Sequence, residues 1–291
     1  MDTAKYQVLL SAIETGSYSA AAEKCGYTVS GISRMISSLE EETCFPLLVR
    51  GKTGVLPTAE CKELLPDLKA FIQQADLCQQ KINAIRGLET GTVRIGTAYS
   101  TFYKEISEIT AEFHQSHPGI VIQIRNGYST ELATAMDHGE LDICMISKRE
   151  HHGTWLPLFE NEILAAVPEN DPLAKESSVP ITAFATHPYI ETYPQSDNDN
   201  TRAFHTHRIR PNIQFTTVDS YATRSMVEAG LGISLNNQLN TMGWDQHGIV
   251  MLPVTPRLPV EIGIAVGEHC TKAVQIYLEQ LYEKIKKRTD H

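Results

Sequence analysis

The chain has 291 residues, of which 42% are hydrophobic, 21% are charged and 7% are aromatic. This composition suits about two globular domains with sizeable cores, and it excludes a chain that is disordered or fibrous throughout. No apolar run approaches the roughly 18 residues that a membrane helix needs, so no membrane partner is expected. The first residues lack the basic and apolar regions of a signal peptide, which predicts a cytoplasmic protein.

The formal net charge of −10 argues against a protein that coats nucleic acid, because such proteins carry a basic balance. This net charge does not exclude a small DNA-binding module attached to an acidic domain. The six cysteines are scattered and contain no CxxC pair, so neither a zinc site nor a disulfide framework is indicated. We expect six reduced thiols, with a redox pair as the alternative.

Residues 1–58 are predicted to form three short helices and a hairpin. Turn and capping residues divide the helices, namely Gly16 after the first, Ser19 before the second and Thr28 before the third. The third helix carries one apolar face, formed by Ile32, Met35, Ile36 and Leu39. Two helices joined by a short glycine-containing turn are the helix-turn-helix pattern. Gly51 and Gly54 then bracket a candidate wing, with Arg50 and Lys52 near its tip.

A long helix is predicted over residues 59–88, and its apolar residues alternate at steps of three and four. They are Cys61, Leu64, Leu68, Phe71, Ala75, Cys78, Ile82 and Ile85. This spacing is that of a coiled coil, and a narrow stripe with polar flanks favours a seam between two chains. The alternative is a helix packed on its own domain. Pro66 could kink the helix near its start.

From a hinge at residues 89–91 onward, strand-like and helix-like segments alternate, which predicts an α/β domain over 89–291 with a largely parallel sheet. The strand-like runs cover 93–98, 120–125, 141–147, 163–167, 213–217, 233–235 and 260–266. The helix-like stretches cover 102–117, 129–138, 220–229 and 269–287. Residues 197–200 are expected to form a polar loop.

The N-terminal segment resembles the LysR-type transcriptional regulators. The residues that carry the resemblance are the run from Gly16 to Ala22, the run from Ser30 to Ile36, the pair Leu39-Glu40, and the run from Pro46 to Arg50. They correspond in order and spacing to the family's GSF-x-x-AA helix, S-x-x-x-S-R-x-I recognition helix, LE pair and LF-x-R wing. Looser matches follow at 119–127, 139–142 and 229–233, so the resemblance covers the whole chain.

The resemblance implies an α/β effector domain of the periplasmic-binding-protein type, with two subdomains, preceded by an all-α winged helix-turn-helix and a long linker helix. The subdomains are expected at roughly 92–163 with 267–291, and at roughly 164–266. A homodimer through the linker helix, and a homotetramer of such dimers, are also implied. Four positions depart from the family pattern: Val29 replaces a glutamine that can reach bases, Cys44 a turn glycine, Leu48 the wing phenylalanine, and Pro57 a leucine.

For double-stranded DNA, the start of the third helix supplies the small polar residues that approach base edges in the major groove. The expected contacts are Thr28, Ser30, Gly31, Ser33, Arg34 and Ser37, with Arg50 and Lys52 on phosphates from the wing. The alternative to DNA contact is that the serine-rich start only caps the helix and that Arg34 is a solvated surface charge. Residues 1–90 hold nine Lys and Arg against eleven Asp and Glu, so Glu40, Glu41 and Glu42 are expected to point away from DNA.

For the effector, ligands of such sheets lie at the carboxyl ends of strands, beside the helices that follow. This rule selects Ser100, Thr101, Ser129, Thr130 and Ser147, whose hydroxyls and backbone N–H groups suit a carboxylate or another polar anion. Helix capping is the structural alternative. Arg202, in a basic cluster over 201–210, could clamp a ligand carboxylate, although a solvated loop or a subunit contact is the favoured interpretation.

The sequence contains no GxSxG, HExxH, phosphate-loop or GxGxxG motif, so neither catalytic residues nor a metal or cofactor is predicted. The pair His205 and His207, with Asp197 and Asp199 nearby, does not complete a known ligand set. The alternative function is an enzyme or small-molecule-binding protein that carries a helix-turn-helix. The effector, the promoter and the sign of regulation are not encoded in any motif.

Overall fold

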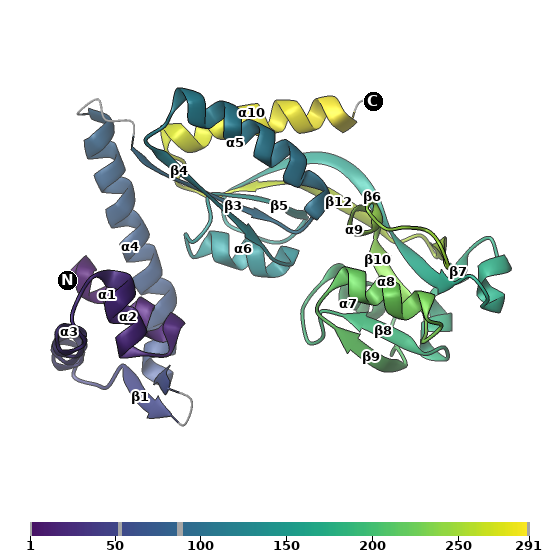
Figure 1. The fold of residues 1–291 in the computed structure, drawn as a ribbon, viewed down its shortest axis with the longest axis horizontal. Coiled ribbons are helices and arrows are strands. Elements are labelled where there is room, and N and C mark those ends of the chain that lie inside the picture. Colours follow the sequence, from purple (N-terminus) through teal and green to yellow (C-terminus); the bar gives the residue numbers. More distant parts are fainter. Residues whose placement is uncertain (1, 52–53, 86–89, 290–291) are drawn as a thin grey trace. The chain divides into compact units, whose positions relative to one another are not determined.

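The computed structural model describes residues 2–51, 54–85 and 90–289 (Figure 1). The chain forms two compact units, one comprising residues 1–90 with 138–140 and the other residues 91–137 with 141–291. Among the described helices, none combines the length and the apolar character that crossing a lipid bilayer requires.

The N-terminal unit contains four helices and a hairpin in its described residues. They are α1 (Thr3–Thr15), α2 (Tyr18–Cys25), α3 (Val29–Thr43), β1 (Leu48–Gly51), β2 (Gly54–Pro57) and α4 (Ala59–Ile85). Gly16 ends α1 in the left-handed conformation, with φ 64°, as expected. Thr28 caps α3, because its hydroxyl accepts the N–H of Gly31 at 3.1 Å. The second cap differs from the prediction: Ser17, not Ser19, accepts the N–H of Ala20.

Glu40 of α3 and Thr58, just before α4, both bond to the segment that enters the wing. One carboxylate oxygen of Glu40 accepts the N–H groups of Leu47 at 2.8 Å and Leu48 at 3.2 Å. The hydroxyl of Thr58 donates to the carbonyl of Pro46 at 2.9 Å and caps α4. Cys44, at the turn where the family has glycine, takes φ 62°, the strained left-handed conformation that its position predicts.

One hydrophobic core holds this unit together, and α4 takes part in it. Leu9, Ile32, Ile36 and Leu39 are fully buried in the core and join α1 to α3. The first half of α4 packs on the same core through Cys61, Leu64, Leu68 and Phe71. The ring of Phe71 meets that of Tyr6 edge to face, with centroids 6.0 Å apart.

The C-terminal unit is larger. Its strands are β3 (Gly91–Thr97), β4 (Ile120–Asn126), β5 (Ile143–Ser147), β6 (Thr154–Pro168), β7 (Val179–Pro180), β8 (Tyr189–Thr192), β9 (Ile213–Thr217), β10 (Ser234–Asn237), β11 (Ile249–Thr255) and β12 (Pro259–Val266). Its α-helices are α5 (Tyr103–Ser116), α6 (Ser129–Asp137), α7 (Asp199–Thr206), α8 (Ser220–Glu228), α9 (Gln238–Thr241) and α10 (Lys272–Thr289). Short 3₁₀ turns are η1 (Ser100–Phe102), η2 (Pro172–Lys175) and η3 (Ile181–Ala185).

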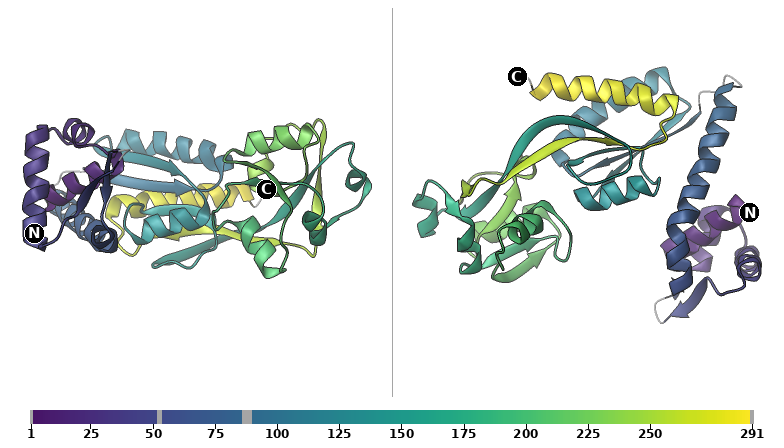
Figure 2. Two further views of the ribbon diagram at one scale, coloured as in Figure 1. Left: turned by 90° about the horizontal axis from the view of Figure 1, so that it is seen from below. Right: turned by 180° about the vertical axis from the view of Figure 1, so that it is seen from behind.

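Eight of the described strands form one mixed sheet in the order β4-β3-β5-β12-β6-β11-β7, with β10 also paired to β6. Only β3 with β4, β3 with β5 and β11 with β7 are parallel there, so the expectation of a largely parallel sheet was wrong. Helices α5 and α10 cover one face of the β3–β5 region and α6 the other (Figures 1 and 2). Strand β5 is therefore buried on both faces, which explains its continuous apolar sequence.

Two long neighbouring strands, β6 and β12, connect the two halves of the C-terminal unit (Figure 2). The first part of β6 pairs with β12, and its second part, from Ile163, pairs with β10 and β11. Because β12 also pairs with β5, residues 259–266 belong to the sheet of the first half. The chain thus forms two subdomains, here called subdomain one and subdomain two, but the return crossing comes at β12 rather than at residue 267.

Several elements of subdomain two differ from the sequence prediction. Residues 199–206, assigned in part to a polar loop and in part to a solvated basic cluster, form helix α7. The parallel pair β8 and β9 forms a separate sheet, and β8 and β11 were not predicted at all. Strand β6 begins nine residues earlier than predicted. Its first half was missed because it contains the polar residues Glu160, Asn161 and Glu162, which interrupt the apolar pattern.

Candidate functional site

Helix α3 separates an apolar face from a polar one. Its buried face contributes to the N-terminal core, while the opposite face exposes Ser30, Ser33, Arg34 and Ser37 at helical spacing. Thr28 is exposed at the cap and Gly31 is half-buried beside it. These are six of the residues predicted to contact DNA, and the helix presents them together as one surface, here called the α3 face. Arg50 lies on strand β1, and Lys52 lies outside the described residues.

The three glutamates that end α3 do not behave alike. Glu40 is engaged with the wing amides, and Glu42 pairs with Lys5, which lowers the pKa of its carboxyl group. Glu41 is exposed and follows Ser37 by four residues, so it lies on the same side of the helix as the α3 face. It sits roughly 16 Å along the helix from Ser30, at the end that a recognition helix turns away from base edges.

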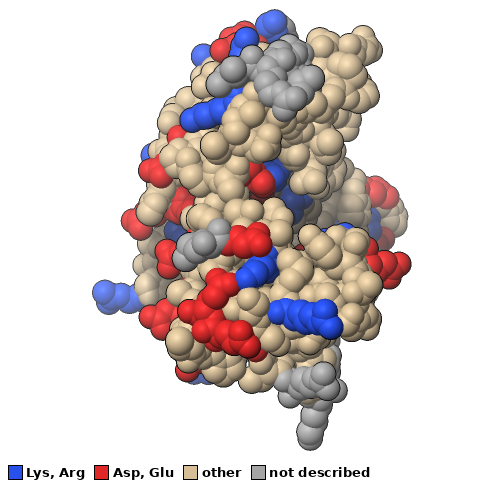
Figure 3. Space-filling view, turned by 90° about the vertical axis from the view of Figure 1, so that its left-hand side faces the viewer, with Lys and Arg blue, Asp and Glu red and all other residues tan. Residues whose placement is uncertain are grey.

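Charges of both signs are mixed on the side of the protein drawn in Figure 3, and no continuous basic surface covers the residues described there.

The predicted seam of α4 falls into two parts. Leu64, Leu68 and Phe71 pack on the chain's own N-terminal core, so for this part the alternative of a helix packed on its own domain describes the structure. Ala75 is half-buried, Cys78 is exposed, and Ile82 exposes 43% of its surface. Ile85 ends the helix. A seam between chains stays a prediction for the exposed part.

In the C-terminal unit, a cleft of about 260 Å³ is lined by residues of both subdomains. Subdomain one contributes Tyr99, Ser100, Ser129 and Arg149, among others. Subdomain two contributes polar and aromatic side chains, including Thr192, Tyr193, Asn198, Asp199, Asp219, Tyr221, Asn236 and Asn237. Burial, together with the charge of Asp199, raises the pKa of the Tyr99 hydroxyl, so this group stays protonated.

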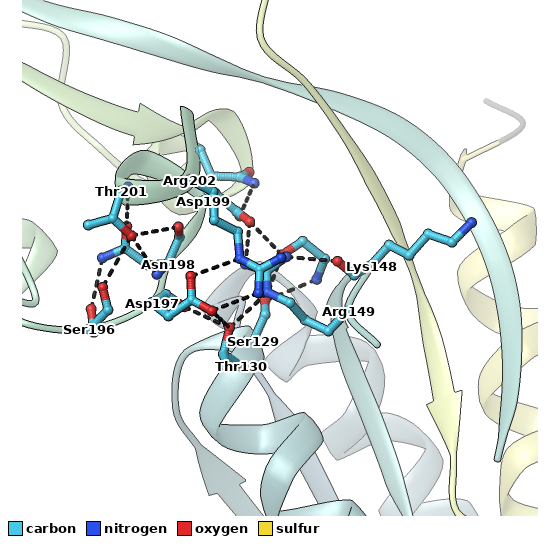
Figure 4. Close-up of polar contacts among 12 residues, drawn as sticks. Ser129, Thr130, Lys148, Arg149, Ser196, Asp197, Asn198, Asp199, Thr201 and Arg202 are labelled. Carbon is cyan, nitrogen blue, oxygen red and sulfur yellow. Dashed lines mark hydrogen bonds and ion pairs between the residues drawn. The ribbon is translucent and has the colours of Figure 1, made fainter. Parts of the chain in front are cut away.

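A chain of hydrogen bonds crosses between the subdomains (Figure 4). The N–H of Ser147 donates to the hydroxyl of Ser129 at 3.0 Å, and the two hydroxyl oxygens lie 2.8 Å apart. The hydroxyl of Ser147 lies 2.8 Å from Oδ1 of Asp199, the first residue of α7. Both serines are buried.

Arg149, two residues after β5, forms an ion pair with the same carboxylate. Its Nη2 lies 2.6 Å from Oδ1 of Asp199, and the two side chains expose 5% and 15% of their surface. The other two nitrogen atoms of this guanidinium bond to subdomain one. Nε donates to the Thr130 hydroxyl at 2.9 Å, and Nη1 donates to the Lys148 carbonyl at 2.8 Å (Figure 4).

The comparison with known protein families agrees with this architecture. Residues 4–62 match the family described as "Bacterial regulatory helix-turn-helix protein, lysR family", and residues 86–285 match the "LysR substrate binding domain". The chain belongs to the LysR family of transcriptional regulators. It therefore contains a DNA-binding helix-turn-helix domain and an effector-binding domain.

Relatives and solved structures match from about two thirds to nearly all of this LysR-family regulator. YybE of Bacillus subtilis, an uncharacterized HTH-type transcriptional regulator, is 27% identical over 84% of this chain and 85% of its own length. A full-length OxyR variant from Pseudomonas aeruginosa shares the fold with a TM-score of 0.68, at 16% identity over 98% and 95% of the two chains. The effector binding domain of QuiR in complex with shikimate has a TM-score of 0.56, at 21% identity over 68% and 98%.

The residues predicted to bind the effector of the LysR-family regulator divide into two groups. Ser100 and Ser129 line the cleft, and Ser147 lies directly behind Ser129. Thr130 is the partner of Arg149 and donates to the carbonyl of Asp197 at 2.7 Å. These four positions are brought together around the cleft or its polar edge.

Thr101 and Arg202 are directed elsewhere in the regulator. The hydroxyl of Thr101 accepts from Nη2 of Arg288 at 3.1 Å, on the side of α10. Arg202 directs Nε and Nη2 to the two oxygens of Asp197, at 2.8 and 2.6 Å, and this contact lowers the pKa of Asp197. Neither side chain lines the cleft, so the structure does not support Arg202 as a clamp within it.

Sequence reasoning missed two central residues of the cleft in this LysR-family regulator. Arg149 carries no motif, although it stands two residues after a buried strand that was predicted correctly. Asp199 was considered only as a metal ligand, because its helix was not recognised. A signal for that helix is present, since Asn198 and Thr201 form a capping box at its start. Among the described residues, no group of three or more His, Cys, Asp or Glu side chains is arranged to hold a metal ion.

Proposed function

We propose that this regulator reads DNA through the α3 face and responds to a small polar effector bound in the cleft between its two subdomains. The observation that carries the proposal is the cleft itself, where hydroxyl, amide and carboxylate groups from both subdomains surround about 260 Å³ of space. A concave, polar site at the junction of two subdomains is the place where a small ligand contacts both at once. The QuiR domain, which shares this fold, was solved with shikimate and supports the same use here.

The α3 face supports sequence-specific contacts to DNA. Ser30 and Ser33 are small enough to let the helix approach base edges, and Arg34 can bond guanine or a phosphate. Val29 exposes 47% of its surface at the start of the helix, so it can contact a thymine methyl group where the family's glutamine would form hydrogen bonds. Residues on the wing, Arg50 and Lys52, are proposed to neutralise phosphates.

Double-stranded DNA is proposed to be bound by a homodimer. The N-terminal residues are not basic overall, so two linked copies of the α3 face would add avidity that one copy lacks. The exposed residues Cys78 and Ile82 in the second half of α4, with the half-buried Ala75 beside them, support an interface between two chains. Pairing of dimers into a homotetramer through the C-terminal units is implied by the family resemblance. We propose the cytoplasm as the location of this regulator.

Effector binding would act by selecting one arrangement of the protein. A molecule that contacts both subdomains favours the arrangement in which those contacts are best, and it shifts the equilibrium only by its difference in affinity. The DNA-binding domains would then be presented in a different spacing.

The first test is a thermal-shift screen of metabolites on the full-length protein, followed by gel shifts with genomic fragments. We expect one compound to raise the melting temperature and to change retardation of a specific fragment. Ser100→Ala should weaken the binding of that compound by about 0.5–1.5 kcal/mol, because it removes one hydroxyl group from the cleft. Ser107→Ala, on the exposed side of α5, is the matched control and should leave the affinity unchanged.

If Ser100→Ala and Ser107→Ala bind the compound with equal affinity, Ser100 is not part of the effector site. Turnover of the compound in the absence of any specific DNA retardation would favour the alternative of an enzyme that carries a helix-turn-helix.

A further inference from the structure

The carboxylate of Asp199 accepts hydrogen bonds from two donors of the opposite subdomain at Oδ1, while Nδ2 of Asn237, in its own subdomain, lies 3.5 Å from Oδ2. Asp199 begins α7 in subdomain two, whereas Ser147 and Arg149 follow β5 in subdomain one. One oxygen, Oδ1, lies 2.8 Å from the hydroxyl of Ser147 and 2.6 Å from Nη2 of Arg149. A carboxylate group from subdomain two is thus inserted among hydroxyl and guanidinium groups of subdomain one.

The direction of the hydrogen bonds shows which charge these groups favour. An ionised carboxylate only accepts hydrogen bonds, so the single proton of the Ser147 hydroxyl points to Asp199. The hydroxyl oxygens of Ser129 and Ser147 lie 2.8 Å apart, and the Ser129 hydroxyl also accepts the N–H of Ser147 at 3.0 Å. The hydroxyl chain therefore ends in a proton aimed at an anion, next to a buried guanidinium.

The donors are held in place independently of Asp199. Arg149 is fixed by Thr130 and by the carbonyl of Lys148, and Ser147 is fixed by the end of strand β5 and by Ser129. If the carboxylate left, these groups would keep their positions, and the buried guanidinium would lack its counter-ion. A second anion of similar size would satisfy the same donors.

We propose that Ser129, Ser147 and Arg149 form an anion subsite of the effector cleft, that the chain's own Asp199 fills it in the absence of effector, and that a carboxylate-bearing effector replaces Asp199 there. Ser129, Arg149 and Asp199 all line the cleft, so a molecule within it reaches this subsite. Exchange of one carboxylate for another keeps Arg149 neutralised but releases α7 from subdomain one. This inference rests on the proposed use of the cleft and names the chemistry of its ligand.

The decisive experiment removes the internal carboxylate and supplies an external one. Asp199→Ala in the full-length protein is melted in sodium acetate and in sodium chloride of equal ionic strength. We expect acetate to raise the melting temperature of this variant in a saturable manner, with at least ten-fold tighter apparent binding than in the wild type, where Asp199 competes.

Two controls separate this subsite from general effects of the salt. Asp197→Ala removes a carboxylate that pairs with Arg202 at the surface, where both side chains are about half exposed, and should show no acetate-specific shift. Arg149→Ala combined with Asp199→Ala removes both charges and should also lose the acetate response. Equal acetate shifts in all variants, or no shift in Asp199→Ala, would overturn the proposal.

Folding and function can be kept apart in this test. If Asp199→Ala is unfolded in chloride, recovery of the folded state in acetate supports the subsite, and an unfolded protein in both salts contradicts it. Acetate binding requires neither DNA nor the natural effector. Failure to find any effector, or an unchanged Ser100→Ala affinity, therefore affects the proposed function alone, whereas the acetate result decides the subsite.

Discussion

The α3 face and the effector cleft are built in opposite ways. The residues of the α3 face lie within ten positions of one another on a single helix, and their common orientation follows from the helical repeat. The cleft joins Tyr99, Ser129, Arg149, Asp199 and Asn237, which lie on separate strands, loops and helices of two subdomains. Its key contact links Ser147 to Asp199, 52 positions apart.

This difference decides how each site responds to change. Side chains of the α3 face are exposed, so their substitution should alter DNA binding with little effect on folding. The polar groups beside the cleft are buried and satisfy one another, so their substitution should affect stability and ligand binding together.

The largest effect is expected from Arg149→Ala. It leaves the partly buried Asp199 carboxylate without its cation, which should lower the stability of the C-terminal unit by about 3–5 kcal/mol. Arg202→Ala, which breaks the more exposed pair with Asp197, should cost about 0–1 kcal/mol. Urea unfolding followed by circular dichroism measures both. Similar losses in the two variants would show that burial does not distinguish these ion pairs.

Within α4, Phe71→Asp should behave differently from Ile82→Asp. Phe71 packs on Tyr6 and the N-terminal core, so a carboxylate there should destabilise that unit by about 3 kcal/mol. Ile82 is exposed, so its variant should stay folded and instead lower the molecular mass measured by sedimentation, if two chains meet along this part of the helix. An unchanged mass for Ile82→Asp would exclude the proposed seam there.

On the α3 face, Arg34→Ala should weaken specific DNA binding by about 1–3 kcal/mol if its guanidinium contacts a base. Lys52 is predicted from the wing sequence to contact phosphates. Lys52→Ala should therefore weaken binding to all DNA sequences alike and reduce the salt dependence of binding. Fluorescence anisotropy at several salt concentrations separates the two. Wild-type affinity in a folded Arg34→Ala dimer would refute the assigned recognition helix.

A smaller effect is expected from Val29→Ala. If Val29 contacts a thymine methyl group, the variant should lose preference at one base position by about 1 kcal/mol and keep its overall fold. Selection from a randomised DNA library measures the preference at each position. A preference profile identical to the wild type would show that Val29 does not contact bases.

The smallest effect concerns Asp142, a buried acid whose environment contrasts with that of Asp199. Its carboxylate accepts the N–H of Arg94 at 2.7 Å, and burial raises the pKa of the carboxyl group. Because the folded-state pKa lies above the unfolded one, the stabilising contribution is complete below the unfolded pKa and is lost as pH rises through the folded pKa. Asp142→Asn should keep the amide contact, melt no lower than the wild type at pH 7, and show a weaker gain on acidification. A clear loss of stability at pH 7 would contradict this.

The sequence by itself determined the elements whose signals are local. Apolar spacing and the caps at Gly16 and Thr28 predicted α1 and α3, and strand-like runs predicted β3 and β5. The family and the character of the α3 face followed from residues close together in the chain. The capping box at Asn198 could have added α7, but strand β6 could not be read in full, because its polar first half is stabilised by pairing with β12.

Only the tertiary structure decided which partners these elements meet. The periodic stripe of α4 did not distinguish a seam between chains from the intramolecular core that Phe71 joins, because both surfaces require the same apolar spacing. Likewise, no local pattern placed the Asp199 carboxylate against Ser147 and Arg149. That contact depends on where β6 and β12 carry the chain between the subdomains, and buried polar groups take whichever donors the fold brings within reach.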